Sequence, residues 1–222
     1  MRTVAAVFTA QSIVESTKQL FAELVPDCRV ISIIEDALIQ DVIRAGQVTP
    51  EIARRLIRYY LAAEDTGADL IFNTCSSIGD VAIMARNLVT IPLVKIDDAM
   101  AAEAVRIGMR VGVLATLQTT LAPTVRLVKA QAEKAGRTVS VVEGLAQGAF
   151  EALVARQAEK HDELVASAAE RVAGQADVIV LAQGSMARME EALAKRTGKP
   201  VLSSPRRGVL EVKDTLERMT RR

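Results

Sequence analysis

One short stretch carries the side chains best suited to chemistry: residues 73–77, with the sequence Asn-Thr-Cys-Ser-Ser. They follow the apolar run Leu-Ile-Phe at residues 70–72, which is typical of a strand buried on both faces, and a helical pattern resumes at Val81. Open α/β sheets bind their ligands where such strands end. A helix start there binds anions and lowers the pKa of a thiol, so Cys75 can act as a base or nucleophile beside a bound carboxylate. The plain alternative is a small apolar residue in a tight turn.

The elements that must position this stretch alternate between strands and helices. We expect strands at residues 4–8, 30–34, 70–72 and 92–96, and helices at residues 12–24, 50–65 and 78–87. Ser12 is a candidate N-cap of the first helix, and Thr49 followed by Pro50 marks the start of the second. This alternation predicts a parallel sheet with helices on both faces.

The second half of the chain repeats the first. Residues 29–35 (Arg-Val-Ile-Ser-Ile-Ile-Glu) match residues 137–143 (Arg-Thr-Val-Ser-Val-Val-Glu) at an offset of 108. At the same offset, Ala-Asp-Leu-Ile at residues 68–71 matches Ala-Asp-Val-Ile at residues 176–179, and the first strand matches residues 111–116 at an offset of 107. A nearly constant offset over several segments indicates duplication.

Duplication predicts an α/β fold of two pseudo-symmetric lobes, each a four-stranded parallel sheet flanked by helices, with the active site in the cleft between them. We place lobe 1 at residues 1–97 plus 206–222 and lobe 2 at residues 98–205. A last helix, from Arg206 to about Met219, is expected to return to lobe 1. The repeat places Gln183 at the position equivalent to Cys75, and a carboxamide carries no proton in the accessible pH range.

Composition excludes several classes of function. The net charge of +1, the aromatic content of 3% and the lack of Trp argue against nucleic acid or an anionic membrane as partner. No apolar run approaches the roughly 20 residues of a membrane span. Two cysteines give no disulfide framework, which favours a cytoplasmic protein, and we expect Cys28 to be structural. We expect His161 at the surface, and one histidine with two cysteines makes no metal site. Lys95 and Arg188 are near enough in sequence to contribute to carboxylate binding, but we expect them to be surface charges.

Residues 73–77 after a buried strand, Ala115-Thr116 with Thr119 after another, and the duplicated lobes together resemble the aspartate/glutamate/hydantoin racemase superfamily. The resemblance implies two α/β lobes, no cofactor, a small carboxylate-bearing substrate and a homo-oligomer. It implies that racemases place one cysteine from each lobe on opposite sides of the substrate Cα. Carried over, Cys75 is the catalytic residue. The substrate-binding positions implied are Thr9, Gln11, Asn73, Thr74, Ser76, Ser77, Thr116, Thr119, Gln183, Gly184 and Ser185.

The sequence departs from the racemase pattern at the second catalytic position, where Gln183 stands and would donate a hydrogen bond to the substrate. Ser185 has a hydroxyl, but its pKa is too high without a base partner. The superfamily also contains a decarboxylase and a cis–trans isomerase that work with one cysteine. Three functions therefore stay open. These are an isomerase acting next to the carboxylate of a small amino acid or related acid, a lyase or decarboxylase using enolate chemistry, and a non-catalytic small-acid-binding protein.

Overall fold

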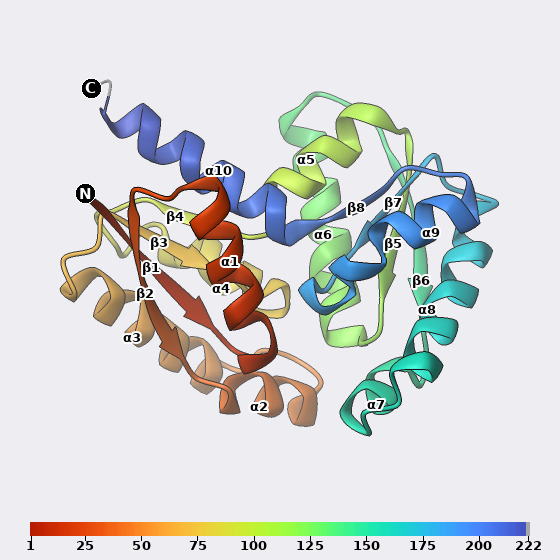
Figure 1. The fold of residues 1–222 in the computed structure, drawn as a ribbon, viewed down its shortest axis with the longest axis horizontal. Coiled ribbons are helices and arrows are strands. Elements are labelled where there is room, and N and C mark those ends of the chain that lie inside the picture. Colours follow the sequence, from red (N-terminus) through yellow and green to blue (C-terminus); the bar gives the residue numbers. More distant parts are fainter. Residues whose placement is uncertain (221–222) are drawn as a thin grey trace. The chain divides into compact units, whose positions relative to one another are not determined.

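The structure, a computed structural model, describes residues 1–220. They form two compact units: unit 1 consists of residues 1–96 and the segment from Pro205 onward, and unit 2 of Asp97–Ser204. Each unit contains one four-stranded parallel sheet with helices packed against it (Figure 1). The α/β class and the two parallel sheets predicted from the sequence are thereby confirmed.

The sheet of unit 1 has the strand order β2-β1-β3-β4. Its strands are β1 (Arg2–Phe8), β2 (Cys28–Ile34), β3 (Leu70–Asn73) and β4 (Leu93–Lys95). The inner strands are largely buried, because nearly all of their residues are apolar. Val7 pairs with Asn73, and Asn73 pairs with Lys95, so the carboxyl ends of β1, β3 and β4 lie along one edge of this sheet.

Helices cover both faces of the unit 1 sheet. One face packs against α1 (Val14–Leu24) and against the part of α10 (Ser204–Thr220) that begins at Pro205. The other face packs against α2 (Ala37–Ala45), α3 (Pro50–Asp65) and α4 (Gly79–Ala85). The helix predicted at residues 50–65 is confirmed, because Thr49 Oγ1 accepts the backbone N–H of Ile52 at 3.4 Å and Pro50 occupies the first turn.

Two local expectations are wrong in unit 1. The sequence predicts Ser12 as an N-cap, but Gln11–Ile13 forms a 3-10 turn and α1 begins at Val14 without a side-chain cap. The expected helices also leave out the segment between the second strand and residue 50, where α2 forms. Leu38 and Val42 are both buried there, since residues four apart share one face of a helix.

Unit 2 has the same arrangement, with the strand order β6-β5-β7-β8. Its strands are β5 (Arg110–Ala115), β6 (Ser140–Leu145), β7 (Val178–Leu181) and β8 (Val201–Ser203). One face packs against α5 (Asp98–Ile107) and α6 (Gln118–Lys134). The other face packs against α7 (Ala149–Val154), α8 (Ala158–Ala173) and α9 (Glu190–Thr197). The repeated strand order is the structural counterpart of the sequence repeat.

A repeated aspartate joins the first and third strands of each unit at their amino ends. In unit 1, Asp69 accepts hydrogen bonds from Arg2 Nη1 at 2.5 Å and from the backbone N–H of Thr3 at 2.8 Å. In unit 2, Asp177 accepts from Arg110 Nη2 at 2.6 Å and from the backbone N–H of Arg110 at 2.9 Å. The two Ala-Asp pairs of the sequence repeat therefore make equivalent contacts.

Asp177 makes stability depend on acid pH. The side-chain hydrogen bond from Arg110, with the backbone N–H groups of Arg110 and Met109, lowers the pKa of Asp177 to about 2. Because a free Asp has a pKa of about 3.9, this contribution to stability is present above pH ~4 and is lost as the pH falls through about 2. We expect Asp177→Asn to lower the free energy of unfolding at pH 7, and less so near pH 2.

Urea titrations of wild type and Asp177→Asn at both pH values measure this effect. Asp65→Asn is the matched control, since Asp65 is exposed at the end of α3. Equal losses for Asp177→Asn at pH 7 and near pH 2 would contradict the assignment.

Candidate active site

Cys75 lies in a short loop at the carboxyl end of β3. The strand ends at Asn73, Ser76–Ile78 forms a 3-10 turn, and α4 begins at Gly79. Cys75 forms no disulfide, is of intermediate exposure and has an extended backbone, and it packs against the core cluster that contains residues of α3 and α4. The change from a buried strand to a helix start therefore occurs at Cys75, as the sequence predicts.

Asn73 and Thr74 fasten this loop to the rest of unit 1. The Asn73 side chain is fully buried: its Oδ1 accepts from Tyr60 Oη at 2.9 Å, and its Nδ2 donates to the carbonyl oxygen of Cys75 at 3.0 Å. Thr74 Oγ1 donates to the carbonyl oxygen of Val7 at 2.9 Å. These bonds hold the backbone of Cys75 against α3 and β1, so both side chains serve as anchors of the loop.

The two serines that follow Cys75 occupy the helix start. Ser76 and Ser77 are largely buried, with exposed fractions of 8% and 5%. The backbone N–H of Gly79 donates to the carbonyl oxygen of Ser76, which closes the 3-10 turn. Hydroxyl groups and N–H groups at such a turn are suitable ligands for a carboxylate.

The loop after β1 lies beside the Cys75 loop, because β1 and β3 are neighbouring parallel strands. Thr9 is buried there, whereas Gln11 is exposed and its Nε2 lies 3.5 Å from Asp36 Oδ2. The predicted site residues of unit 1 are thus at one sheet edge: Thr9, Gln11, Asn73, Thr74, Cys75, Ser76 and Ser77.

A charged cluster follows β2 at the same edge. Glu35 accepts hydrogen bonds from Arg55 Nη2 and Tyr59 Oη, each at 2.8 Å, and Arg55 also binds Asp41 at 2.6 Å. Burial raises the pKa of Glu35, but the bonds from Arg55 and Tyr59 outweigh it and hold this pKa below its ordinary value. Glu35 therefore stays ionised near neutral pH and braces α2 and α3.

In unit 2 the position equivalent to Cys75 is occupied by Gln183, two residues after the end of β7. Its Oε1 accepts the backbone N–H of Thr116 at 2.7 Å, and its Nε2 donates to Thr116 Oγ1 at 2.7 Å. Both ends of the carboxamide thus bind the residue that follows β5. Gln183 thereby fastens the ends of two neighbouring strands together, and the hydrogen bond to a substrate stays a prediction.

The other predicted residues of unit 2 lie near these strand ends. Gly184 and Ser185 begin the 3-10 segment Gly184–Met189 and are partly exposed. Thr119 lies in the first turn of α6, and its hydroxyl is buried without a hydrogen-bond partner within residues 1–220. A buried hydroxyl without a partner can accept or donate a bond to a ligand.

The surface position predicted for His161 is wrong. His161 is fully buried in α8, and its Nδ1 lies 2.7 Å from Asp162 Oδ1. Asp162 in turn accepts from Arg188 Nη1 at 2.7 Å, which ties α8 to the segment after Gln183. The sequence signal was the helical spacing, since His161 and the buried Val165 are four residues apart. Arg188 is exposed, as predicted.

The surface position predicted for Lys95 is also wrong. Lys95 is the last residue of β4 and is only 2% exposed. It follows the buried Leu93 by two residues, and this spacing puts both side chains on the same face of the sheet. A lysine inside an apolar strand pattern was the signal that could have marked it as a candidate site residue.

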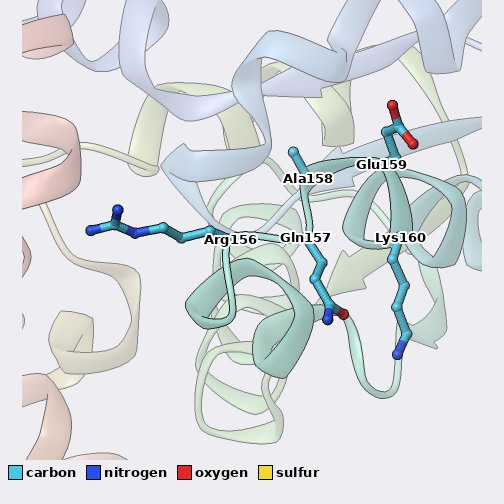
Figure 2. Close-up of a pocket in the computed structure, with 5 residues that line it drawn as sticks. All are labelled: Arg156, Gln157, Ala158, Glu159 and Lys160. Atoms are coloured by element: carbon cyan, nitrogen blue, oxygen red, sulfur yellow. The ribbon is translucent and has the colours of Figure 1, made fainter.

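Within residues 1–220, no group of three or more His, Cys, Asp or Glu side chains is placed to hold a metal ion. No helix in this part of the chain is long and apolar enough to cross a membrane. An open hollow of about 490 Å³ lies at the turn between α7 and α8 (Figure 2). Arg156, Glu159 and Lys160 line it and point in different directions, and none of the predicted site residues is among its lining.

The chain belongs to the Asp/Glu/Hydantoin racemase family, which matches residues 6–212. The resemblance seen in the sequence is thereby confirmed. No curated protein sequence matches the chain.

Solved structures share this fold at low sequence identity. The glutamate racemase RacE1 from Bacillus anthracis is 11% identical with a TM-score of 0.80, over 98% of this chain and 82% of that one. The allantoin racemase from Pseudomonas fluorescens is 19% identical with a TM-score of 0.67, over 98% and 92%. An arylmalonate decarboxylase is 18% identical with a TM-score of 0.58, over 95% and 91%.

Proposed function

We propose that this protein is a cofactor-independent isomerase that acts at the carbon next to the carboxylate of a small amino acid or related acid. The observation that carries the proposal is the position of Cys75: a half-buried thiol at a strand end, before a helix start. Asn73 holds its carbonyl group, so the loop is preorganised for proton transfer. Membership of the racemase family supports the same chemistry.

The proposed step is a proton transfer at Cα. The Cys75 thiolate takes the proton, and the electrons of the broken C–H bond move into the carboxylate to give an enediolate. For isomerisation, a water molecule gives a proton to the opposite face of Cα, and the Cys75 thiol gives its proton to the hydroxide that forms, which restores the thiolate. Ser76, Ser77 and the N–H groups of their turn would bind the carboxylate, with Thr9 and Gln11 beside them. In unit 2 we assign substrate binding to Thr116, Thr119, Gly184 and Ser185.

One observation favours a lyase or decarboxylase as the second candidate. Gln183 is bound at both ends by Thr116 and cannot carry a proton, so it does not replace the second thiol of a racemase. A decarboxylase needs only one proton donor. The C–C bond electrons would stay on Cα as carbon dioxide leaves, and the Cys75 thiol would then protonate Cα.

The non-catalytic small-acid-binding protein is the remaining alternative. The cytoplasmic location and the homo-oligomer stay predictions.

Alkylation of the two cysteines tests the site. Burial raises the pKa of Cys28 above its ordinary value, so Cys28 is a slow internal control. Near pH 7, we expect iodoacetamide to label Cys75 at least about tenfold faster than Cys28, because a thiol at a helix start is more ionised. A small carboxylic acid that binds should protect Cys75 and leave the Cys28 rate unchanged. Slow, equal labelling of both thiols would instead favour the binding protein.

A further inference from the structure

Lys95 is a buried cation in the unit that carries the cysteine. Its side chain is only 2% exposed, although a charged lysine is costly to bury. Lys95 pairs in register with Asn73, the residue that holds the Cys75 carbonyl group. Paired residues of neighbouring parallel strands share one face, so Lys95 lies on the same face of the sheet as the Asn73 side chain.

Gly79 shows where the end of this lysine lies. A Cβ atom at Gly79 would be 2.8 Å from Lys95 Cε and 3.1 Å from Lys95 Nζ. The ammonium group therefore lies against the first residue of α4, and one 3-10 turn, with a rise of about 6 Å, separates Gly79 from Ser76. A cation at a helix start opposes the helix dipole, so stabilisation of α4 does not explain this position.

The equivalent position in unit 2 has a different charge. There Leu181 pairs with Ser203 in the register that joins Asn73 to Lys95. The backbone N–H of Ser203 donates to Glu190 Oε2 at 2.8 Å, and the Ser203 hydroxyl binds the same oxygen. Unit 2 thus places a hydroxyl and a carboxylate where unit 1 places an ammonium group. The repeat is conserved in backbone pairing but not in charge, and the positive charge belongs to the cysteine-bearing unit.

We propose that Lys95 supplies a fixed positive charge behind the Cys75 loop, which favours the Cys75 thiolate and attracts an anionic reactant to it. This inference rests on the proposed function of Cys75. When the Cα proton moves to Cys75 Sγ, the substrate carboxylate becomes an enediolate with more negative charge, and a nearby cation stabilises it. Lys95 acts through its electric field and does not itself react, so it is a positioning residue.

A pair of alkylating reagents measures this field without knowledge of the substrate. Iodoacetate is anionic and iodoacetamide is neutral, and both react with the thiolate, so the ratio of their rates cancels the thiolate fraction. Each rate is divided by that of a small free thiol at the same pH and low salt. We expect the normalised ratio at Cys75 to fall about three- to tenfold in Lys95→Met, as for loss of one charge several ångströms away. Lys18→Met, at an exposed position of α1, should leave it unchanged.

A second variant keeps the charge and moves it. In Gly79→Ala the new Cβ forces the end of Lys95 to shift, so the ratio should fall between those of wild type and Lys95→Met. Circular dichroism checks that each variant is folded. If Lys95→Met does not fold, two other measurements test the inference. The normalised ratio should fall in Gly79→Ala, and it should fall in wild type at high salt. An unchanged ratio in folded Lys95→Met overturns the inference about Lys95. The proposed function is tested separately, by the turnover of Cys75→Ala.

Discussion

Replacement of Cys75 by alanine is expected to reduce turnover of the substrate by roughly 10²–10⁴-fold, the usual contribution of a positioned acid or base. Cys75→Ser should lose a similar factor, because a serine hydroxyl does not ionise near neutral pH without a base partner. The fold should survive both changes, since Cys75 packs only at the edge of the core and its side chain is partly exposed. Thermal unfolding and circular dichroism check that point.

Cys28→Ala is the matched control for this prediction. Cys28 is the first residue of β2 and packs on the face of the sheet opposite to α3 and α4. Burial raises the pKa of its thiol. We expect Cys28→Ala to keep wild-type turnover. Full activity in Cys75→Ala would remove the catalytic role of Cys75 and leave the small-acid-binding protein as the better account.

Asn73→Ala is expected to have the largest effect on stability among the site residues. It removes a fully buried side chain and leaves both Tyr60 Oη and the Cys75 carbonyl oxygen without the bonds that Asn73 provides. Lost hydrogen bonds to buried groups and a new cavity should together lower the free energy of unfolding by about 2–4 kcal/mol. Turnover should fall as well, because the loop loses its anchor.

Two further variants separate these effects. Tyr60→Phe removes only one of the two bonds and should cost about 1 kcal/mol. Asn87→Ala, at an exposed position after α4, should change neither stability nor turnover. Urea unfolding measures all three. If Asn73→Ala were as stable as wild type, the anchoring role of Asn73 would be wrong.

Much of the architecture could be predicted because it depends on local patterns. Apolar runs marked the strands, Thr49 and Pro50 marked the start of α3, and the repeat at residues 68–71 and 176–179 fixed the equivalence of the two sheets. Cys75 could be singled out because the chain changes there from a buried strand to small polar residues. These signals need no knowledge of contacts between distant residues.

The remaining features depend on such contacts. Gln183 binds Thr116 across 67 residues of sequence, and no spacing rule connects the two. Lysine and histidine often lie at the surface, yet Lys95 and His161 are buried. They are buried because each lies on the face of its strand or helix that packs into the core. The Cys75 loop could therefore be predicted from the sequence, but the residues that surround it could be identified only from the structure.

Proton nuclear magnetic resonance in D2O tests the central claim most directly. Wild type and Cys75→Ala would be incubated with a panel of small α-amino, α-hydroxy and malonic acids, and Cα–H signals and carbon dioxide release would be followed in parallel. The account predicts that wild type exchanges the Cα proton of at least one acid, or releases carbon dioxide from it, and that Cys75→Ala does neither. Equal exchange or release by both proteins, or binding of an acid by wild type without either change, would contradict it.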